Sequence, residues 1–149
     1  MRVRRGAVVL IAALALVAAS CNDQHDDGAR RARTRNVTVD EKASGATVSL
    51  HVGDHLTVVL HSTYWQINAP DPRAAGLVIA GPQRTRAAHC GHIPGAGCGT
   101  ATREFRADRR GVATVSAHRD SCGEALRCTG TQSDWKVTAA ITESPERSR

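Results

Sequence analysis

The clearest pattern in this chain is a regular alternation of apolar and polar residues that begins after the first 35 residues. In the segments 36–40, 48–52 and 56–60, every second residue is Val or Leu. Alternation with a period of two is typical of a β-strand that buries one face. Gly53 and Asp54 stand between the second and third segments and predict a turn there. We therefore expect three short strands, the last two joined by a tight turn.

Strand-like segments continue along the chain, and no apolar pattern with the 3.6-residue period of a helix runs beside them. The further candidate strands are 64–68, 77–80, 100–107, 112–118 and 135–141. Seven to eight short strands separated by Gly, Pro and Asp predict an all-β domain, an immunoglobulin-like β-sandwich over residues 36–142. The chain has only four aromatic residues, and we expect three of them, Trp65, Phe105 and Trp135, to anchor the core.

The first 20 residues have the pattern of a secretory signal. Three arginines, Arg2, Arg4 and Arg5, precede thirteen apolar residues, and small residues follow. The apolar run is too short for a membrane-spanning helix, which needs about 20 residues, and its length suits a signal peptide. We therefore expect residues 1–20 to direct export and to be removed.

The signal ends in Ala18-Ala19-Ser20-Cys21, which resembles the lipobox of bacterial lipoproteins. This resemblance implies that Cys21 carries a lipid and holds the mature protein on the outer face of the cell membrane. Ordinary secretion, with Cys21 left as a free thiol, is the alternative. In both cases the mature protein works outside the cytoplasm.

Two polar segments flank the predicted domain. After the cysteine, residues 22–35 contain no apolar side chain larger than that of Ala, so we expect 21–35 to be a lipidated, disordered tether. Residues 143–149 are also polar and predict a disordered tail. The formal net charge of +6 belongs largely to the ends, because the segment 37–141 carries 11 basic and 9 acidic residues. This balance argues against a nucleic-acid partner, which requires positive charge on the folded part.

Four cysteines remain after the lipidation site: Cys90, Cys98, Cys122 and Cys128. An even number of cysteines outside the cytoplasm predicts two disulfides. Pairing between sequence neighbours, Cys90 with Cys98 and Cys122 with Cys128, closes the smallest loops. The Gly and Pro residues between the first two also allow the chain to turn sharply. The two other connectivities of four cysteines stay open from the sequence.

The polar side chains contain no clear catalytic or metal-binding motif. His89 and His92 flank Cys90, but this spacing is not that of a known zinc module, and an oxidising compartment favours a disulfide. The chain has no Gly-x-Ser-x-Gly nucleophile elbow and no Gly-rich phosphate loop. The polar run 118–121 is interpreted as a solvated loop. We therefore expect a protein that is not an enzyme and that uses no metal or cofactor.

Three stretches of the chain, taken together, carry a family resemblance. Residues 53–60, Gly-Asp-His-Leu-Thr-Val-Val-Leu, lead into Ser-Thr-Tyr-Trp at 62–65. Residues 105–115 then form a strand, turn and strand pattern, and Trp-Lys-Val-Thr follows at 135–138. This order resembles that of chagasin-like cysteine protease inhibitors over about residues 36–142, and it implies an immunoglobulin-like sandwich.

The 18 Arg against 2 Lys indicate a GC-rich genome, such as that of an actinobacterium.

In that family, three loops at one end of the sandwich enter the active-site cleft of a papain-like protease. By position, the resemblance implies that the loops here are His61–Tyr64, a segment within His92–Gly99, and Arg119–Cys128. The candidate partner-binding residues are Thr63, Tyr64, Pro94, Gly95, Gly97, Arg119 and Asp120.

The loops depart from the family's pattern. The family's first loop has Asn-Pro-x-Thr-Gly before the Tyr, where this chain has only Ser62 and Thr63. The family's last loop has Arg-Pro-Trp, where this chain has Arg119, Asp120 and Ser121. The two expected disulfides are also foreign to the family. We therefore expect the scaffold to be shared more closely than the inhibitory loops.

Two functions fit these observations. The first is a membrane-anchored, extracytoplasmic binding or structural module that is not an enzyme and has a protein partner, such as a protease or a cell-surface component. The second is a chagasin-type inhibitor of papain-like cysteine proteases. The small and apolar segment 93–97 suits an inhibitor, whereas Arg119 and Asp120 do not. We expect the binding module, with the inhibitor as the alternative.

Overall fold

The computed structural model describes residues 34–71, 76–91, 95–123 and 126–144, which lie in the compact unit Ala32–Arg149. The expected signal peptide and Cys21 lie outside these ranges, as do Pro94 and most of the expected tether and tail. No helix in the described part of the chain is long and apolar enough to cross a membrane.

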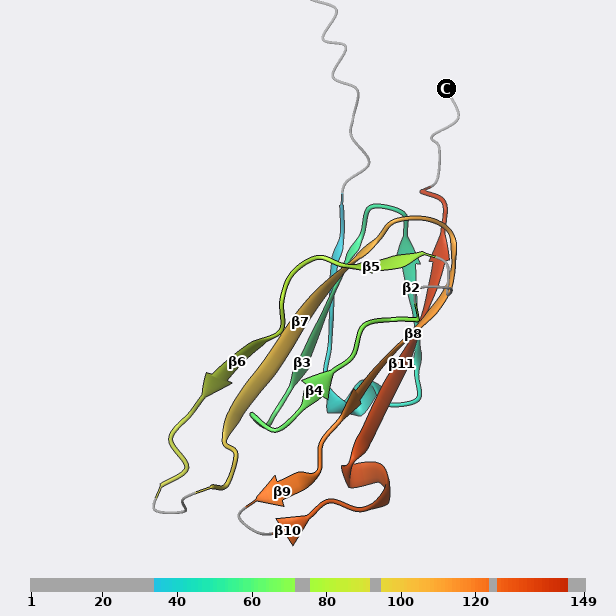
Figure 1. Ribbon diagram of the computed structural model, residues 1–149. Coiled ribbons are helices and arrows are strands. Elements are labelled where there is room, and N and C mark those ends of the chain that lie inside the picture. Colours follow the sequence, from blue (N-terminus) through green and yellow to red (C-terminus); the bar gives the residue numbers. More distant parts are fainter. Residues whose placement is uncertain (1–33, 72–75, 92–94, 124–125, 145–149) are drawn as a thin grey trace, which may run out of the picture. The chain divides into compact units, whose positions relative to one another are not determined.

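The described residues form an all-β sandwich of two main sheets and one small hairpin (Figure 1). The first sheet has the order β1 (Asn36–Val39), β3 (His55–Leu60), β7 (Gly99–Ala107), β5 (Leu77–Ile79), and β6 (Arg84–Ala87) also pairs with β7. The second sheet has the order β2 (Thr47–His51), β11 (Asp134–Thr142), β8 (Gly111–His118), β4 (Gln66–Ile67). The hairpin is formed by β9 (Ser121–Gly123) and β10 (Leu126–Arg127), and two short 3-10 turns are η1 (Glu41–Ala43) and η2 (Gly130–Gln132). The predicted fold class is confirmed, and β6, β9 and β10 are strands that the alternation did not predict.

The core lies between the two sheets, and the alternation of each strand supplies it. In β3 the inward side chains of Leu56, Val58 and Leu60 are fully buried, because alternate residues of a strand point to the same face. The three expected aromatic anchors are also buried, with 0% of Phe105 and 3% of both Trp65 and Trp135 exposed. Their expected place in the core is therefore confirmed.

The strand pairings determine which connections share an end of the sandwich. The short turn 108–110 joins the end of β7 at Ala107 to the start of β8 at Gly111. The opposite ends of these two strands, Gly99 and His118, must therefore lie together at the far end of the sandwich. The antiparallel neighbours of β7 and β8 also reach this end. Strand β3 ends beside the start of β7, and β11 begins beside the end of β8.

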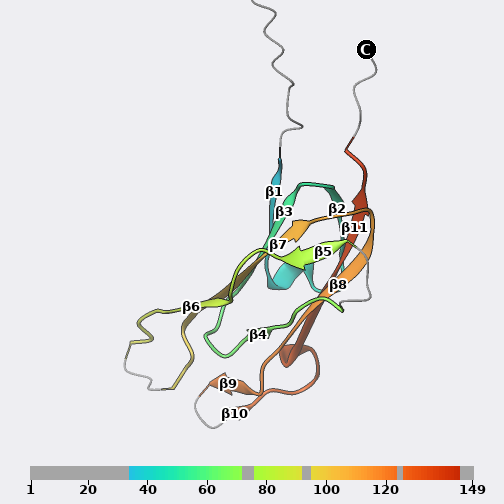
Figure 2. The ribbon, with the colours of Figure 1, turned by 45° about the horizontal axis from the view of Figure 1, so that its top comes forward.

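Three connections therefore share one end of the sandwich, which we call the loop end. They are the first loop (61–65, between β3 and β4), the second loop (88–98, between β6 and β7) and the third loop (119–133, between β8 and β11). Residues 92–94 of the second loop and 124–125 of the third are not among the described residues. Figures 1 and 2 place β9 and β10 at this end, whereas β1 begins and β11 finishes at the opposite end.

Candidate partner-binding site at the loop end

The first loop is a tight connection that the core holds at both sides. Leu60 is fully buried before it, and Trp65 is buried at its end. The Ser62 N–H donates to the Leu60 carbonyl at 3.1 Å, and the Ser62 hydroxyl, which is also buried, accepts from the Tyr64 N–H at 3.2 Å. The hydroxyl thus satisfies a backbone group that the turn leaves without a strand partner. In this loop His61 is exposed, and Thr63 and Tyr64 are half-exposed.

The second loop is closed at its base by a disulfide between Cys90 and Cys98, whose Cα atoms are 5.6 Å apart. Beside it, the Cys98 N–H donates to the Cys90 Sγ at 3.1 Å, and the Ala88 N–H donates to the Cys98 carbonyl at 3.0 Å. Gly95 and Gly97 have φ of 71° and 66°, in the left-handed region that glycine adopts without steric cost. The disulfide and the glycines together fix a sharp return of the chain.

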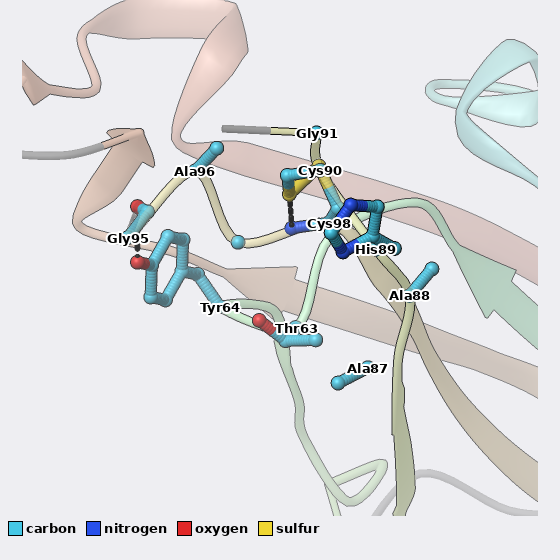
Figure 3. Close-up of a pocket in the computed structure, with 11 residues that line it drawn as sticks. Thr63, Tyr64, Ala87, Ala88, His89, Cys90, Gly91, Gly95, Ala96 and Cys98 are labelled. Atoms are coloured by element: carbon cyan, nitrogen blue, oxygen red, sulfur yellow. Dashed lines mark hydrogen bonds between the residues drawn. A yellow bond between two sulfur atoms is a disulfide. The ribbon is translucent and has the colours of Figure 1, made fainter. Parts of the chain in front are cut away.

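Tyr64 joins the first loop to the second (Figure 3). Its hydroxyl donates to the Gly95 carbonyl at 2.5 Å, and the neighbouring Thr63 N–H donates to the Gly97 carbonyl at 2.8 Å. The Tyr64 ring lies so close to Gly97 that a β-carbon at that position would overlap the ring. The two loops therefore form a single unit, and the Tyr64 side chain is directed at the second loop.

The third loop has its own disulfide, between Cys122 and Cys128, with a Cα separation of 5.1 Å. The Cys128 N–H donates to the Asp120 carbonyl at 2.9 Å, which closes the hairpin of β9 and β10 at its base. Both disulfides thus connect sequence neighbours, as the smallest-loop argument expects.

The third loop packs on the other two loops at different points. The Arg119 guanidinium lies over the Trp65 ring, 4.5 Å from its centre, and Arg119 Nε donates to the Gln132 carbonyl at 2.8 Å. A cation above the face of an indole is attracted by the ring quadrupole. On the other side, a β-carbon on Gly123 would stand 3.9 Å from the backbone of Ala96 in the second loop. The loop end is therefore a continuous surface that runs over all three loops.

Three ionisable side chains, those of His118, Asp120 and Asp134, lie together at the base of the third loop. His118 Nδ1 is 2.9 Å from an Asp134 oxygen, and His118 Nε2 is 3.0 Å from an Asp120 oxygen. The hydrogen bonds to Asp134 and Asp120 raise the pKa of His118 above its ordinary value of 6.5. Hydrogen bonds from His118 and Ser133 lower the pKa of Asp134. This arrangement holds no nucleophilic hydroxyl against the imidazole, so it is a charged bridge rather than a catalytic triad.

Comparison of the sequence with protein-family models and with curated proteins found no match. Solved structures do match its fold. The cysteine protease inhibitor EhICP2 from Entamoeba histolytica superimposes with a TM-score of 0.53 at 11% identity, covering 74% of this chain and 98% of that chain. Amebosin superimposes with a TM-score of 0.50 at 12% identity, covering 74% and 100%. The chain has the chagasin-like fold. At these identities, the likeness is one of fold alone.

The chagasin-like fold brings six of the seven candidate residues to the loop end, and the seventh, Pro94, lies outside the described residues. Two of the six are half-exposed but use their polar groups for contacts within the domain. Tyr64 is directed at the second loop, and Arg119 lies over Trp65. Asp120 is open to solvent, with 92% of its side chain exposed. A direct role of these residues in partner binding stays a prediction.

A hollow of about 580 Å³ is lined by residues of the first loop, the second loop and the end of β6 (Figure 3). Most of its lining residues are small, and Tyr64 and His89 are the larger side chains among them. Among the residues that the structure describes, no three His, Cys, Asp or Glu side chains gather closely enough to hold a metal ion. This surface therefore offers small side chains and backbone groups, together with the Tyr64 ring and the His89 imidazole.

Four features of the loop end were not predicted from the sequence: the nearness of Gly123 to Ala96, the packing of Tyr64 on Gly97, the Arg119–Trp65 stack and the His118 bridge. The first three bring together residues from different loops, and no local pattern encodes such an arrangement. One feature of the sequence could have predicted the His118 bridge. If β8 and β11 pair as the last two long strands, their register sets His118 opposite Asp134.

Proposed function

We propose that this protein is a non-enzymatic binding module that inhibits papain-like cysteine proteases through its loop end. The observation that carries this proposal is the union of three loops into one braced surface at the end of a chagasin-like fold. A solved protein that shares the fold, EhICP2, is described as a cysteine protease inhibitor. This support places the inhibitor ahead of a binding module with an unspecified partner, which the sequence alone favours.

A rigid, narrow surface suits the inhibition of a protease. Loops that are already ordered lose little conformational entropy when they enter a cleft, so more of the contact energy remains as affinity. At the loop end, the order comes from two disulfides and from the Tyr64 hydrogen bond. Gly95, Ala96 and Gly97 present backbone with very small side chains, which a narrow cleft can accept.

The division of roles differs from the pattern that the family resemblance implies. We propose that the backbone of 95–97 and the exposed side of Thr63 make the contact with the protease. Tyr64 and Arg119 instead hold the loops in place, because their side chains are engaged within the domain. This assignment accounts for the absence of the family's first-loop and last-loop motifs.

Titration of papain with the oxidised protein tests the proposal. We expect reversible inhibition in the nanomolar range, and Ala96→Glu should weaken it at least about tenfold because the cleft would desolvate the new carboxylate. Ala80→Glu is the matched control, since Ala80 is exposed after β5, away from the loop end, and should inhibit as the natural protein does. Absence of inhibition at tens of micromolar would overturn the inhibitor assignment and leave a module with another partner.

We also propose that a lipid on Cys21 tethers the domain to the outer face of the cell membrane. The lipobox resemblance motivates this proposal, and the fold is compatible with it because β1 begins at the end opposite the loops. A tether attached there leaves the loop end free to meet a partner. Cys21→Ser should move the protein from the membrane fraction to the soluble extracellular fraction. Unchanged membrane retention of this variant would refute lipidation at Cys21.

A further inference from the structure

His118 lies where strands β8 and β11 of the second sheet meet the third loop. It is the last residue of β8, Asp134 is the first residue of β11, and Asp120 belongs to the third loop. The two ring nitrogens of His118 lie 2.9 Å from Asp134 and 3.0 Å from Asp120. A single imidazole therefore connects the third loop to the neighbouring strand.

This geometry requires a charged imidazole. An ionised carboxylate only accepts hydrogen bonds, whereas a neutral imidazole has one N–H donor and one bare nitrogen. Both nitrogens of His118 can face carboxylates favourably only when both carry a proton. When one proton is lost, one ring nitrogen of His118 presents its lone pair to a carboxylate. The lone pair then repels the carboxylate oxygen.

The other groups around His118 do not replace this interaction. Lys136 of β11 lines a second hollow together with His118 and Asp134, and the Arg119 guanidinium lies over Trp65. On the other neighbouring strand, β4 sets the neutral Gln66 opposite His118, and η2 contributes no charged side chain. The two carboxylates are therefore the groups that respond to the charge of His118, and they raise its pKa above the ordinary value of 6.5.

Asp120 is the carboxylate that the neutral ring would release. Its side chain is 92% exposed, so water can hydrate it fully, whereas Asp134 is 71% exposed and also accepts from the Ser133 hydroxyl at 2.9 Å. Release of Asp120 affects the whole hairpin, because the Asp120 carbonyl accepts the Cys128 N–H and the disulfide joins Cys128 to Cys122.

We propose that His118 is a pH-sensitive bridge that holds the third loop against β11 when it is protonated and frees the loop when it is neutral. The inference concerns the free protein and does not depend on which partner the loop end binds. For a group whose pKa is raised in the ordered state, the stabilisation is complete below the ordinary pKa. It is lost as the pH rises through the pKa of the ordered state. The third loop is therefore best ordered in acidic surroundings.

The test measures two quantities in the oxidised protein between about pH 5 and about pH 8.5, a range that spans the titration of histidine. NMR of the imidazole gives the pKa of His118, and amide hydrogen exchange gives the protection factor of the Cys128 N–H. The variants are His118→Gln, Asp120→Asn and, as a control, His55→Gln, which removes a histidine of the first sheet that lies outside the bridge. His55 begins β3 at the opposite end from the loops.

We expect the protection factor of Cys128 to fall as the pH rises through the measured pKa of His118. The size of this fall follows from linkage. The protection factor should drop tenfold for each pH unit by which the pKa of His118 is higher in the natural protein than in Asp120→Asn. His118→Gln should show no such step, and His55→Gln should keep it. A flat protection factor in the natural protein, an equal step in His118→Gln, or a His118 pKa that Asp120→Asn does not lower would each overturn the proposal.

Discussion

Asp54 is a buried carboxylate that joins the start of the domain at Arg35 to the end of β2 at His51. Only 5% of the side chain is exposed, and its two oxygens accept from the Arg35 N–H at 2.9 Å and the His51 N–H at 2.8 Å. Burial alone would raise the pKa of Asp54, but these two N–H groups, with the charges of Arg35 and His51, outweigh it and hold the pKa below 3.8. The sequence predicts the turn at Gly53 and Asp54, but not the contact with Arg35, because that contact depends on the fold.

We expect Asp54→Asn to destabilise the domain by about 2–3 kcal/mol at neutral pH, because each carboxylate oxygen now accepts one N–H. An amide group has only one oxygen, so its NH₂ would face a backbone N–H without an acceptor. Urea unfolding at about pH 7 and about pH 3 measures the difference between the two proteins.

The pH dependence of this difference has a definite sign. A carboxyl group with a lowered pKa stabilises the fold above its ordinary pKa, and this contribution is lost as the pH falls through its pKa in the fold. The gap between natural protein and Asp54→Asn should therefore narrow in acid. Asp108→Asn is the control, because Asp108 pairs with Arg106 on the exposed surface, where ion pairs contribute little. If Asp54→Asn lowers the free energy of unfolding no more than Asp108→Asn does, the proposed role of the Asp54 carboxylate is wrong.

The strands were predicted well because their information is local. Strands β3 and β11 bury every second residue, and that alternation is visible in the sequence. Strand β6 was missed for the same reason, since all four of its residues are exposed and carry no alternation. The hairpin of β9 and β10 has too few residues to show a period.

The loops depend on contacts that the sequence does not reveal. Spacing predicted the two local disulfides, and these close the second and third loops. The position of Tyr64 against Gly97 could not be predicted, because it requires the first and second loops to be adjacent in the fold. The family resemblance implied that the loops share one end and that Tyr64 and Arg119 bind a partner. Both side chains make contacts within the domain, and their role in binding stays a prediction.

We expect Gly97→Ala to separate the first loop from the second, because the new methyl group would overlap the Tyr64 ring. Gly45→Ala is the matched control, since Gly45 also has a positive φ, 81° against 66°, but no atom lies within 4 Å of the added carbon. Both variants have backbone strain, so the overlap should make Gly97→Ala less stable than the control by about 1–3 kcal/mol. Equal losses in urea unfolding would show that Tyr64 does not pack on Gly97.

At the scale of the whole domain, the two ends have different roles. The chain enters β1 and leaves β11 at one end, and the three loops occupy the other (Figure 1). The sandwich core, with Trp65 and Phe105 fully packed, separates the two ends and holds the loops at fixed positions. This separation allows a tethered domain to present its loops to a protein partner.

Amide hydrogen exchange of the oxidised protein, measured alone and with excess papain, tests this account most directly. We predict slower exchange in the complex at 61–65, 88–91, 95–98 and 119–123, and no change in the turns 51–54 and 108–110 at the opposite end. The loop end must be covered if it enters the protease cleft, whereas the opposite end must stay open to solvent. Slower exchange at the opposite turns, or no change anywhere under conditions that saturate the protease, would contradict the proposal that the loop end binds it.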